Sequence, residues 1–253
     1  MILDTQIISY YFSGYWEAKE AMNAEISSVT ASEFLLFHTR ENNSVDYYVL
    51  DPERYIEEMV EMLMLEHAKN PKWAKLGRRR TDSLIIDFSK DFPPYRLYGN
   101  KAITSIINNQ KIKIFKASIA HLKKERQKML SRKIEFLFDY EIKCHGIDES
   151  VCNIGMDLFE KFQSNISPKN NIKNTINDIL ILATSANMKQ SLVTQDKVLG
   201  RFASEVYNGK IEDYKTEIMI DFPSDESKIE RKNKESKGYV NRGWSYSFKK
   251  GKL

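Results

Sequence analysis

Cysteine and histidine are scarce in this chain of 253 residues, which has two cysteines and four histidines. Two cysteines, Cys144 and Cys152, cannot build a disulfide framework. The four histidines show no spacing typical of zinc ligands, which leaves little room for a zinc cage; His145 lies near Cys144 and Cys152, but an incidental placement is the preferred interpretation. With 10 glycines and 6 prolines, the composition also excludes collagen-like and linker-dominated architectures.

Long apolar runs are also missing. No run reaches the roughly 20 residues that a membrane-spanning helix needs, so no membrane partner is expected. The opening residues, MILDTQIISYYF, have no basic segment and carry Asp4 inside the apolar stretch, unlike a secretory signal peptide. Together with the few cysteines, this predicts a reducing, cytoplasmic compartment.

Positive charge is unevenly distributed, although the formal net charge is only +4. Nine basic residues lie within 111–133 beside the single acid Glu125, and nine more lie within 228–253 beside two acids. Three consecutive arginines occupy positions 78–80. Such clusters indicate a polyanionic partner whose binding weakens with salt. They also fit solvated faces and a disordered tail.

Strand-like segments that run into helix-like segments predict an α/β fold. A strand at residues 2–3 precedes a helix, and a strand at 26–30 runs directly into a helix at 31–37. The final third repeats the pattern, with a helix after Asp148, a helix over 174–190, and strands over 191–194 and 217–222.

The middle of the chain reads as mostly helical. Asp51 followed by Pro52 is a typical helix start, with an N-cap acceptor before a proline. Residues 83–88 predict a strand, and the alternation of KIKIF at 111–115 predicts another. Apolar residues from Ile119 to Leu137 then predict one long basic helix.

Four acids occupy positions that a parallel sheet brings together. Asp4 and Asp196 follow predicted strands, while Glu33 and Asp178 lie near the starts of predicted helices. Because the carboxyl ends of parallel strands share one edge of a sheet, these carboxylates are expected to converge there. A hard cation such as Mg²⁺ or Mn²⁺ would neutralise them and activate water for attack on a phosphoester. Each acid alone also fits a helix cap or a strand end.

The segments MILDT, SSVTASEFLL and NDILILATSANMKQSLVTQD resemble the three motif regions of the PIN domain family. Its members are metal-dependent nucleases, often ribonucleases, and include the toxins of many bacterial toxin–antitoxin pairs. The resemblance implies that Asp4, Glu33, Asp178 and Asp196 are catalytic acids that bind one or two Mg²⁺ or Mn²⁺ ions. It further implies supporting hydroxyls from Thr5 and Thr194, and hydrolysis without a covalent intermediate.

The same resemblance implies a three-layer α/β/α sandwich with a central parallel sheet over residues 1–222. A mostly helical insertion would occupy about 39–149, and a basic linker and tail would follow at 223–253. Compact toxins of the family have a much shorter connection between the second and third motifs. The usual Asp-Thr-Asn opening is Asp-Thr-Gln here, and Leu199 stands where a phenylalanine is common.

The predicted activity is therefore that of an endoribonuclease that cuts RNA. An antitoxin or regulatory protein and a second copy of the chain are further candidate partners. Basic residues of the insertion are expected to guide the nucleic acid; they are Arg78, Arg79, Arg80, Lys123, Lys124, Arg126 and Lys128.

Two alternatives remain open. Asp213, Tyr214 and Lys215 match the Asp-x-Lys ending of a restriction-type nuclease signature, in which case the substrate would be DNA. The other alternative is a catalytically silent PIN-like scaffold that binds RNA or a protein through the basic insertion.

Overall fold

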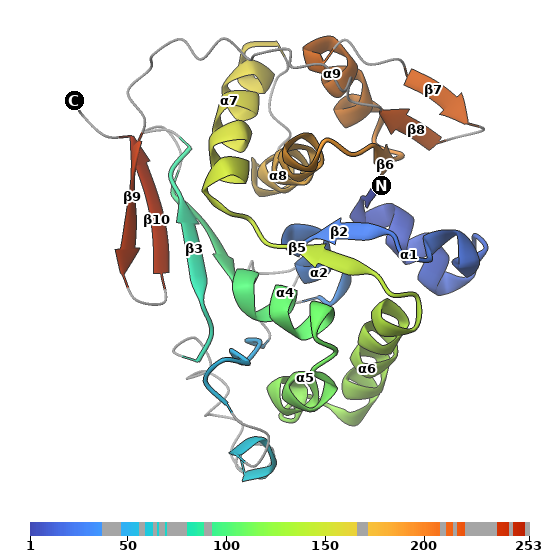
Figure 1. The fold of residues 1–253 in the computed structure, drawn as a ribbon, viewed down its shortest axis with the longest axis vertical. Helices are drawn as coiled ribbons and strands as arrows, with labels where there is room; N and C mark the ends of the chain where they lie inside the picture. The colour runs from blue at the N-terminus through green and yellow to red at the C-terminus, as the bar shows by residue number, and fades with distance from the viewer. Residues whose placement is uncertain are drawn as a thin grey trace. The chain divides into compact units, whose positions relative to one another are not determined.

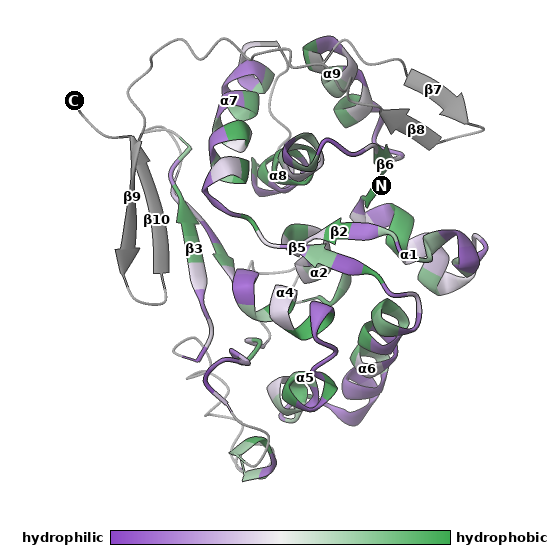
Figure 2. Cartoon of the chain, in the orientation of Figure 1, coloured by the Kyte–Doolittle hydropathy of each residue, from purple (hydrophilic) through white to green (hydrophobic). Residues whose placement is uncertain are grey.

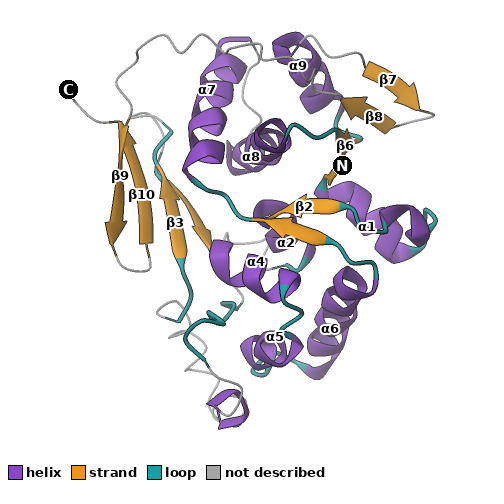
Figure 3. Cartoon of the chain, in the orientation of Figure 1, coloured by secondary structure: helices purple, strands orange, loops and turns teal. Residues whose placement is uncertain are grey.

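A computed structural model of the chain describes residues 1–36, 47–55, 59–62, 65, 69, 80–88, 93–165, 172–207, 211–214, 217–220, 237–242 and 245–250. The chain divides into two units. Unit 1 consists of Met1–Ile7, Leu84–Arg96 and Ile147–Leu253, and unit 2 consists of Ile8–Ser83 and Leu97–Gly146. Strands and helices alternate along the sequence, so the fold is α/β as predicted (Figure 1, Figure 3).

Unit 1 contains most of the predicted motif regions. Its helices and strands are β1 (Ile2–Leu3), the start of α1 (Thr5–Ser13), β3 (Ser83–Ile86), β4 (Tyr95–Tyr98), α7 (Glu149–Asn165), α8 (Ile172–Met188), β6 (Leu192–Thr194), α9 (Lys197–Tyr207), β7 (Ile211–Tyr214), β8 (Glu217–Ile220), β9 (Lys237–Arg242) and β10 (Ser245–Lys250). The division between the units passes through α1 and β4 and just inside the start of β3.

The sheet of unit 1 joins the two ends of the sequence. Strand β1 runs parallel to β6, with Ile2 opposite Leu192 and Leu3 opposite Val193. Strand β8 pairs antiparallel with β6 and with β7. The predicted strand at 217–222 is therefore confirmed over 217–220, whereas its partner β7 was not predicted. The parallel pair places the carboxyl ends of β1 and β6 at the same edge.

A second sheet has the strand order β4-β3-β10-β9. Strands β9 and β10 pair antiparallel, with Ser245 opposite Arg242 and Lys250 opposite Lys237. They belong to the segment predicted as a basic linker and tail, so part of that segment is ordered as strands. The strand predicted over 83–88 is confirmed over 83–86.

Helices α7 and α8 pack side by side in unit 1 (Figure 1). Helix α7 begins as predicted, because Oδ1 of Asp148 accepts a 2.9 Å hydrogen bond from the Val151 amide. Helix α8 buries Ile179 and Leu180 completely. Gly155 permits the close approach, since a Cβ atom at this position would lie 3.1 Å from Cδ2 of Leu180.

Unit 2 holds the shorter strands and the helices of the middle region. Its elements are the rest of α1, a 3₁₀ helix (Ala18–Ala21), β2 (Glu25–Ser27), α2 (Ser28–Phe34), α4 (Asn100–Asn108), α5 (Ile112–Ile119), α6 (Lys124–Asp139) and β5 (Lys143–His145). Strands β2 and β5 are parallel, with Ile26 opposite Cys144.

The strand predicted at 26–30 ends at Ser27. The Ser27 side chain accepts a 3.0 Å hydrogen bond from the Thr30 amide, which makes Ser27 the N-cap of α2. The helix consequently starts three residues earlier than predicted and ends at Phe34.

The strand predicted at 111–115 is wrong, because these residues lead into and begin helix α5. Five alternating residues also fit the first turn of a helix, and Ile114, Phe115 and Ile119 are buried at helical spacing. The predicted long helix is divided as well. Residues 120–123 form a turn, and Nε2 of Gln127 donates to the carbonyl oxygens of Ala120 and Leu122 at 2.9 and 2.7 Å.

Helix α6 is amphipathic, and hydrophilic and hydrophobic residues follow one another along it in Figure 2. Its buried residues are Leu130, Ile134, Phe136 and Leu137. None of the helices in the described part of the chain is both long enough and apolar enough to cross a membrane.

Candidate functional site

Asp4 lies at the carboxyl end of β1 and is only 8% exposed. Its amide donates to the Val193 carbonyl oxygen at 3.1 Å, which continues the parallel pairing by one residue. Oδ1 accepts a 2.6 Å hydrogen bond from the Thr5 amide, and Oδ2 accepts a 2.6 Å hydrogen bond from the Thr194 hydroxyl. The carboxylate is thus held by one backbone donor and one side-chain donor.

Thr194 connects two of the predicted acids. Its side chain is fully buried at the end of β6. While the hydroxyl donates to Asp4, its oxygen accepts a 3.0 Å hydrogen bond from the Asp196 amide. A continuous hydrogen-bonded path therefore runs from Asp4 through Thr194 to the backbone of Asp196.

Asp196 caps helix α9. Oδ1 accepts hydrogen bonds from the amides of Val198 and Leu199 at 2.8 and 3.0 Å. The cap role that the sequence allowed for this residue is therefore present in the structure, and it holds the carboxylate against the first amides of α9.

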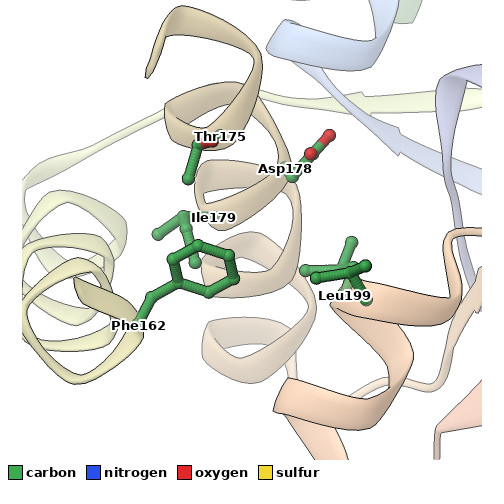
Figure 4. Close-up of a pocket in the computed structure, with 6 residues that line it drawn as sticks. Phe162, Thr175, Asp178, Ile179 and Leu199 are labelled. Carbon is green, nitrogen blue, oxygen red and sulfur yellow. The ribbon is translucent and has the colours of Figure 1, made fainter. Parts of the chain in front are cut away.

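Asp178 lies on α8 and lines a small pocket between α7, α8 and α9 with Phe162, Thr175, Ile179, Val198 and Leu199 (Figure 4). Its carboxylate projects from α8 on the side away from the Phe162 ring in this view. The pocket shares Val198 and Leu199 with the Asp196 cap. Within unit 1, Asp196 caps the start of α9, and Asp178 lines a pocket with the first residues of that helix. Asp4 is linked to Asp196 through the Thr194 hydroxyl.

These carboxylates supply the oxygen donors that Mg²⁺ and Mn²⁺ prefer. Across the described ranges, however, no group of three or more His, Cys, Asp or Glu side chains is arranged to hold a metal ion. The donor chemistry fits a hard cation, while the side chains as they stand are organised by hydrogen bonds to Thr5, Thr194 and the α9 amides.

Glu33 belongs to unit 2, where it lies half-buried on α2. The last carbonyl groups of this short helix receive donors from three distant side chains. Nζ of Lys133 donates to the Phe34 oxygen at 2.6 Å, and the Tyr47 hydroxyl donates to the Leu35 oxygen at 2.7 Å. Nη2 of Arg126 donates to the Leu36 oxygen at 3.4 Å. The end of the helix that carries Glu33 is therefore tied to α6 and to Tyr47.

Lys133 is an inward-facing cation. Its ammonium group lies 4.5 Å from the Phe34 ring centroid and 5.7 Å from the Phe12 ring centroid, within the range of cation–π attraction. Burial lowers the pKa of Lys133 from its usual value.

The predicted nucleic-acid-binding residues separate into different environments. Lys123, Lys124 and Lys128 are exposed on α6 or at its N-cap, as a phosphate-binding role requires. Arg126 is half-buried, and its Nη2 donates to the Leu36 carbonyl oxygen just beyond the end of α2. Arg80 is half-buried, and its carbonyl oxygen accepts from the Asp51 amide at 3.0 Å. Arg78 and Arg79 lie outside the described residues.

Sequence reasoning missed Asp82, which is 2% exposed. Its two carboxylate oxygens accept from the amides of Lys101 and Ala102 at 2.9 and 3.0 Å, at the start of α4. Burial is the main cause of a raised pKa for Asp82, with the nearby Asp51 charge acting in the same direction. A cap supplied from 19 and 20 residues away leaves no local signal in the sequence.

Two further titratable positions lie on β5. His145 pairs through Nε2 with the Glu25 carboxylate on β2. Cys144 and Cys152 are free and buried, and burial raises the pKa of Cys144 to about 12. Neither the histidine nor the cysteines form a metal-binding group with other described residues.

Comparison with known proteins adds no relative, since no protein-family model, curated protein or solved structure matches the chain.

Proposed function

We propose that the chain is a PIN-like, metal-dependent endoribonuclease built on a three-layer α/β/α sandwich. The observation that best supports this is the hydrogen-bonded path Asp4–Thr194–Asp196, which joins the carboxyl ends of two parallel strands to the start of α9. Residues 190 positions apart meet there, in the order and with the side chains that the PIN motifs require.

The proposed roles follow from the positions of the acids. Asp4, Asp178 and Asp196 would hold Mg²⁺ or Mn²⁺, with Glu33 as the fourth acid by resemblance to the family. The bound ion would supply an activated water and stabilise the leaving oxygen of the phosphodiester. Thr194 orients the Asp4 carboxylate, and the Thr5 amide holds its other oxygen.

Supporting side chains of this kind matter because they set the direction of a ligand before the ion binds. Asp4 is nearly buried, and both of its oxygens already have donors. Asp196 is fixed by two amides of α9. The backbone positions of Asp4 and Asp196 are set by β1, β6 and α9.

RNA is the proposed substrate, and an antitoxin-like inhibitor is a candidate partner. Both come from the resemblance to the family, and the exposed lysines of α6 are in keeping with a polyanionic substrate. The free cysteines Cys144 and Cys152 are in keeping with the cytoplasm as the compartment of this activity.

A second candidate function is the catalytically silent scaffold. One observation favours it: in the described part of the chain, the acids do not form a group arranged to hold a metal ion. Asp213 of the restriction-type signature lies on β7, and Lys215 lies outside the described residues, so the structure offers no specific support for that alternative.

The test is cleavage of a fluorescent RNA by the purified chain with Mn²⁺, compared with the same reaction in EDTA. Asp178→Asn removes a proposed ligand and should abolish Mn²⁺-dependent cleavage. Asp157→Asn, on the exposed face of α7, is the matched control and should retain it. Cleavage that persists in EDTA, or in Asp178→Asn, contradicts the proposal. No cleavage and no Mn²⁺-dependent stabilisation of the wild type would favour the scaffold.

A further inference from the structure

The cations of α6 form two sets. Arg126 and Lys133 point toward α2, where they donate to the carbonyl oxygens of Leu36 and Phe34. Lys124, Lys128 and Arg132 are exposed. They follow one another at intervals of four residues, so they lie on the same face of the helix. This exposed set is called the α6 basic row below.

The α6 basic row has a regular geometry. With a rise of about 1.5 Å per residue, its neighbouring members are about 6 Å apart along the helix axis, and the row spans about 12 Å. Lys123, the N-cap residue of α6, extends the positive charge by one more exposed side chain.

The α6 basic row is not neutralised by described neighbours. None of the described acids forms an ion pair with Lys124, Lys128 or Arg132. On the same helix, by contrast, Glu135 pairs with Lys116 of α5 at 3.3 Å. Besides Glu135, the acids of α6 are Glu125 and Asp139, so the four exposed cations Lys123, Lys124, Lys128 and Arg132 outnumber the three acids of the helix by one.

The spacing of these cations is in part unfavourable for the helix, although Glu125 and Glu135, three residues from Lys128 and Arg132, offset some of the repulsion. Like charges at a spacing of four residues repel and destabilise a helix. Lys123 and Lys124 also lie at the N-terminal end, where the helix dipole disfavours cations. A bound polyanion would attract these cations. It would thereby offset both the repulsion between them and their unfavourable interaction with the helix dipole. Local rules are broken in this way most often at functional sites.

The α6 basic row differs from a membrane-binding surface. Interfacial helices insert an exposed apolar face between lipids. Leu130, Ile134, Phe136 and Leu137 of α6 are buried in unit 2, Met129 and Phe138 are half-buried, and no large hydrophobic residue of α6 is exposed. The row therefore offers charge at the surface of the molecule without an apolar face to insert.

We propose that the α6 basic row binds successive phosphates of single-stranded RNA. The choice of RNA as the polyanion rests on the proposed function. The spacing of the row, and its lack of ion pairs with described acids, are independent of that function. Flexible Lys and Arg side chains about 6 Å apart along the helix axis can each reach a separate phosphate of an extended strand. The contacts are with the backbone, so they favour no particular base.

The experiment measures RNA binding without cleavage. Fluorescence anisotropy of a labelled oligouridine is followed in EDTA, with the full chain, between about 50 and 200 mM salt. The test variant combines Lys124→Gln, Lys128→Gln and Arg132→Gln. The control variant removes three exposed lysines on other elements, with Lys19→Gln, Lys143→Gln and Lys161→Gln.

The expected result is a change of slope. Each phosphate contact with a single strand contributes about 0.7 to the slope of log K against log salt, so loss of three contacts should reduce its magnitude by about 2. The control variant should keep the wild-type slope. The test variant should melt at the same temperature as the wild type or higher, because repulsion within the helix is removed.

An unchanged slope of log K against log salt in the test variant overturns the proposal. An equal reduction of the slope in the test and control variants also overturns it, because it would show that binding depends on net charge alone. Stronger binding to vesicles containing phosphatidylserine than to RNA also overturns it. Because binding is measured in EDTA, the result is independent of catalysis. Suppose that the wild type binds RNA without cleaving it and that the test variant loses this binding. That result would support RNA binding by the α6 basic row and would contradict the proposed nuclease activity.

Discussion

The ammonium group of Lys133 lies 2.6 Å from the carbonyl oxygen of Phe34, a residue 99 positions earlier in the sequence. The contact links α6 of the middle region to the end of the helix that carries Glu33. Part of the basic character of α6 is thus structural, since Lys133 and Arg126 satisfy carbonyl groups of α2.

Lys133→Met should destabilise the protein. The substitution keeps a side chain of similar length but leaves the Phe34 oxygen without this donor, and hydrogen bonds to charged groups contribute about 1.5–3 kcal/mol. Lys133→Arg should recover part of the loss. Lys128→Met, on the exposed face of the same helix, should change the free energy of unfolding by no more than about 0.5 kcal/mol. Urea denaturation at neutral pH measures all three, and equal effects at positions 128 and 133 would contradict this role.

Asp82→Asn should change how stability depends on pH. The folded protein raises the pKa of Asp82 above its usual value of 3.8, chiefly through burial. A carboxyl with a raised pKa contributes stability that is fully present below the unfolded value and is lost as pH rises through the folded value. Asparagine keeps an acceptor for one of the α4 amides and does not ionise.

The free energy of unfolding of Asp82→Asn should therefore improve relative to the wild type as pH rises from about 3.8. Denaturant titrations at several pH values between acid and neutral give this difference. A difference that stays constant over the whole range would show that Asp82 ionises as easily in the folded protein as in the unfolded chain.

Thr194→Val should weaken both the fold and the proposed metal site. It removes the hydroxyl that donates to Asp4 and accepts from the Asp196 amide. Leaving buried polar groups without partners costs about 1–3 kcal/mol. Loss of a side chain that orients a metal ligand typically reduces metal affinity or activity by about 10–100-fold.

Thr194→Ser retains the hydroxyl and serves as the control for Thr194→Val. Thermal melts with and without Mn²⁺ report on fold and ion binding, and RNA cleavage reports on activity. If serine and valine behave alike, the hydroxyl contributes neither to stability nor to the site.

Thr175→Val should leave stability unchanged or raise it. Thr175 is 1% exposed, and its hydroxyl has no hydrogen-bond partner among the described residues, so a buried polar group is removed without loss of a bond to them. Thr184→Val on the same helix is the opposite case, because the Thr184 hydroxyl donates to the Leu180 oxygen at 2.8 Å.

Thr184→Val should therefore lower the free energy of unfolding by about 0.5–1.5 kcal/mol. Thermal unfolding of the two valine variants, measured side by side, checks the contrast. A large loss at Thr175 would mean that its hydroxyl does form a stabilising interaction, for example through a bound water.

The sequence predicted those elements whose signals are long or sharply bounded. The helix after Asp148 has a cap and an amphipathic stripe, and the 174–190 helix is followed at once by the β6 strand. The five residues from Lys111 were too few to separate a strand from a helix, and packing decided for the helix. Strand β5 was not predicted because its three residues carry no periodicity. Helix α4 was not predicted either, although Ala102, Ile103, Ile106 and Ile107 stand at helical spacing and are buried.

The candidate site was predictable to a similar extent. Asp4 and Thr194 could be expected to meet, since both end strands of one parallel pair. The roles of Asp82 and Lys133 could not, because their partners lie 19 to 99 residues away in the chain. Contacts of that kind depend on tertiary packing, which local patterns do not encode.

The pairing of β1 with β6 has a consequence during protein synthesis. On the ribosome, Thr194 is synthesised 190 residues after Asp4. Until that late segment leaves the exit tunnel, the first strand has no β6 to pair with, and its acid has no hydroxyl donor. Assembly of this edge thus waits until β6 has been translated, so the Asp4 carboxylate and the Thr194 hydroxyl can meet only after the intervening residues have been made.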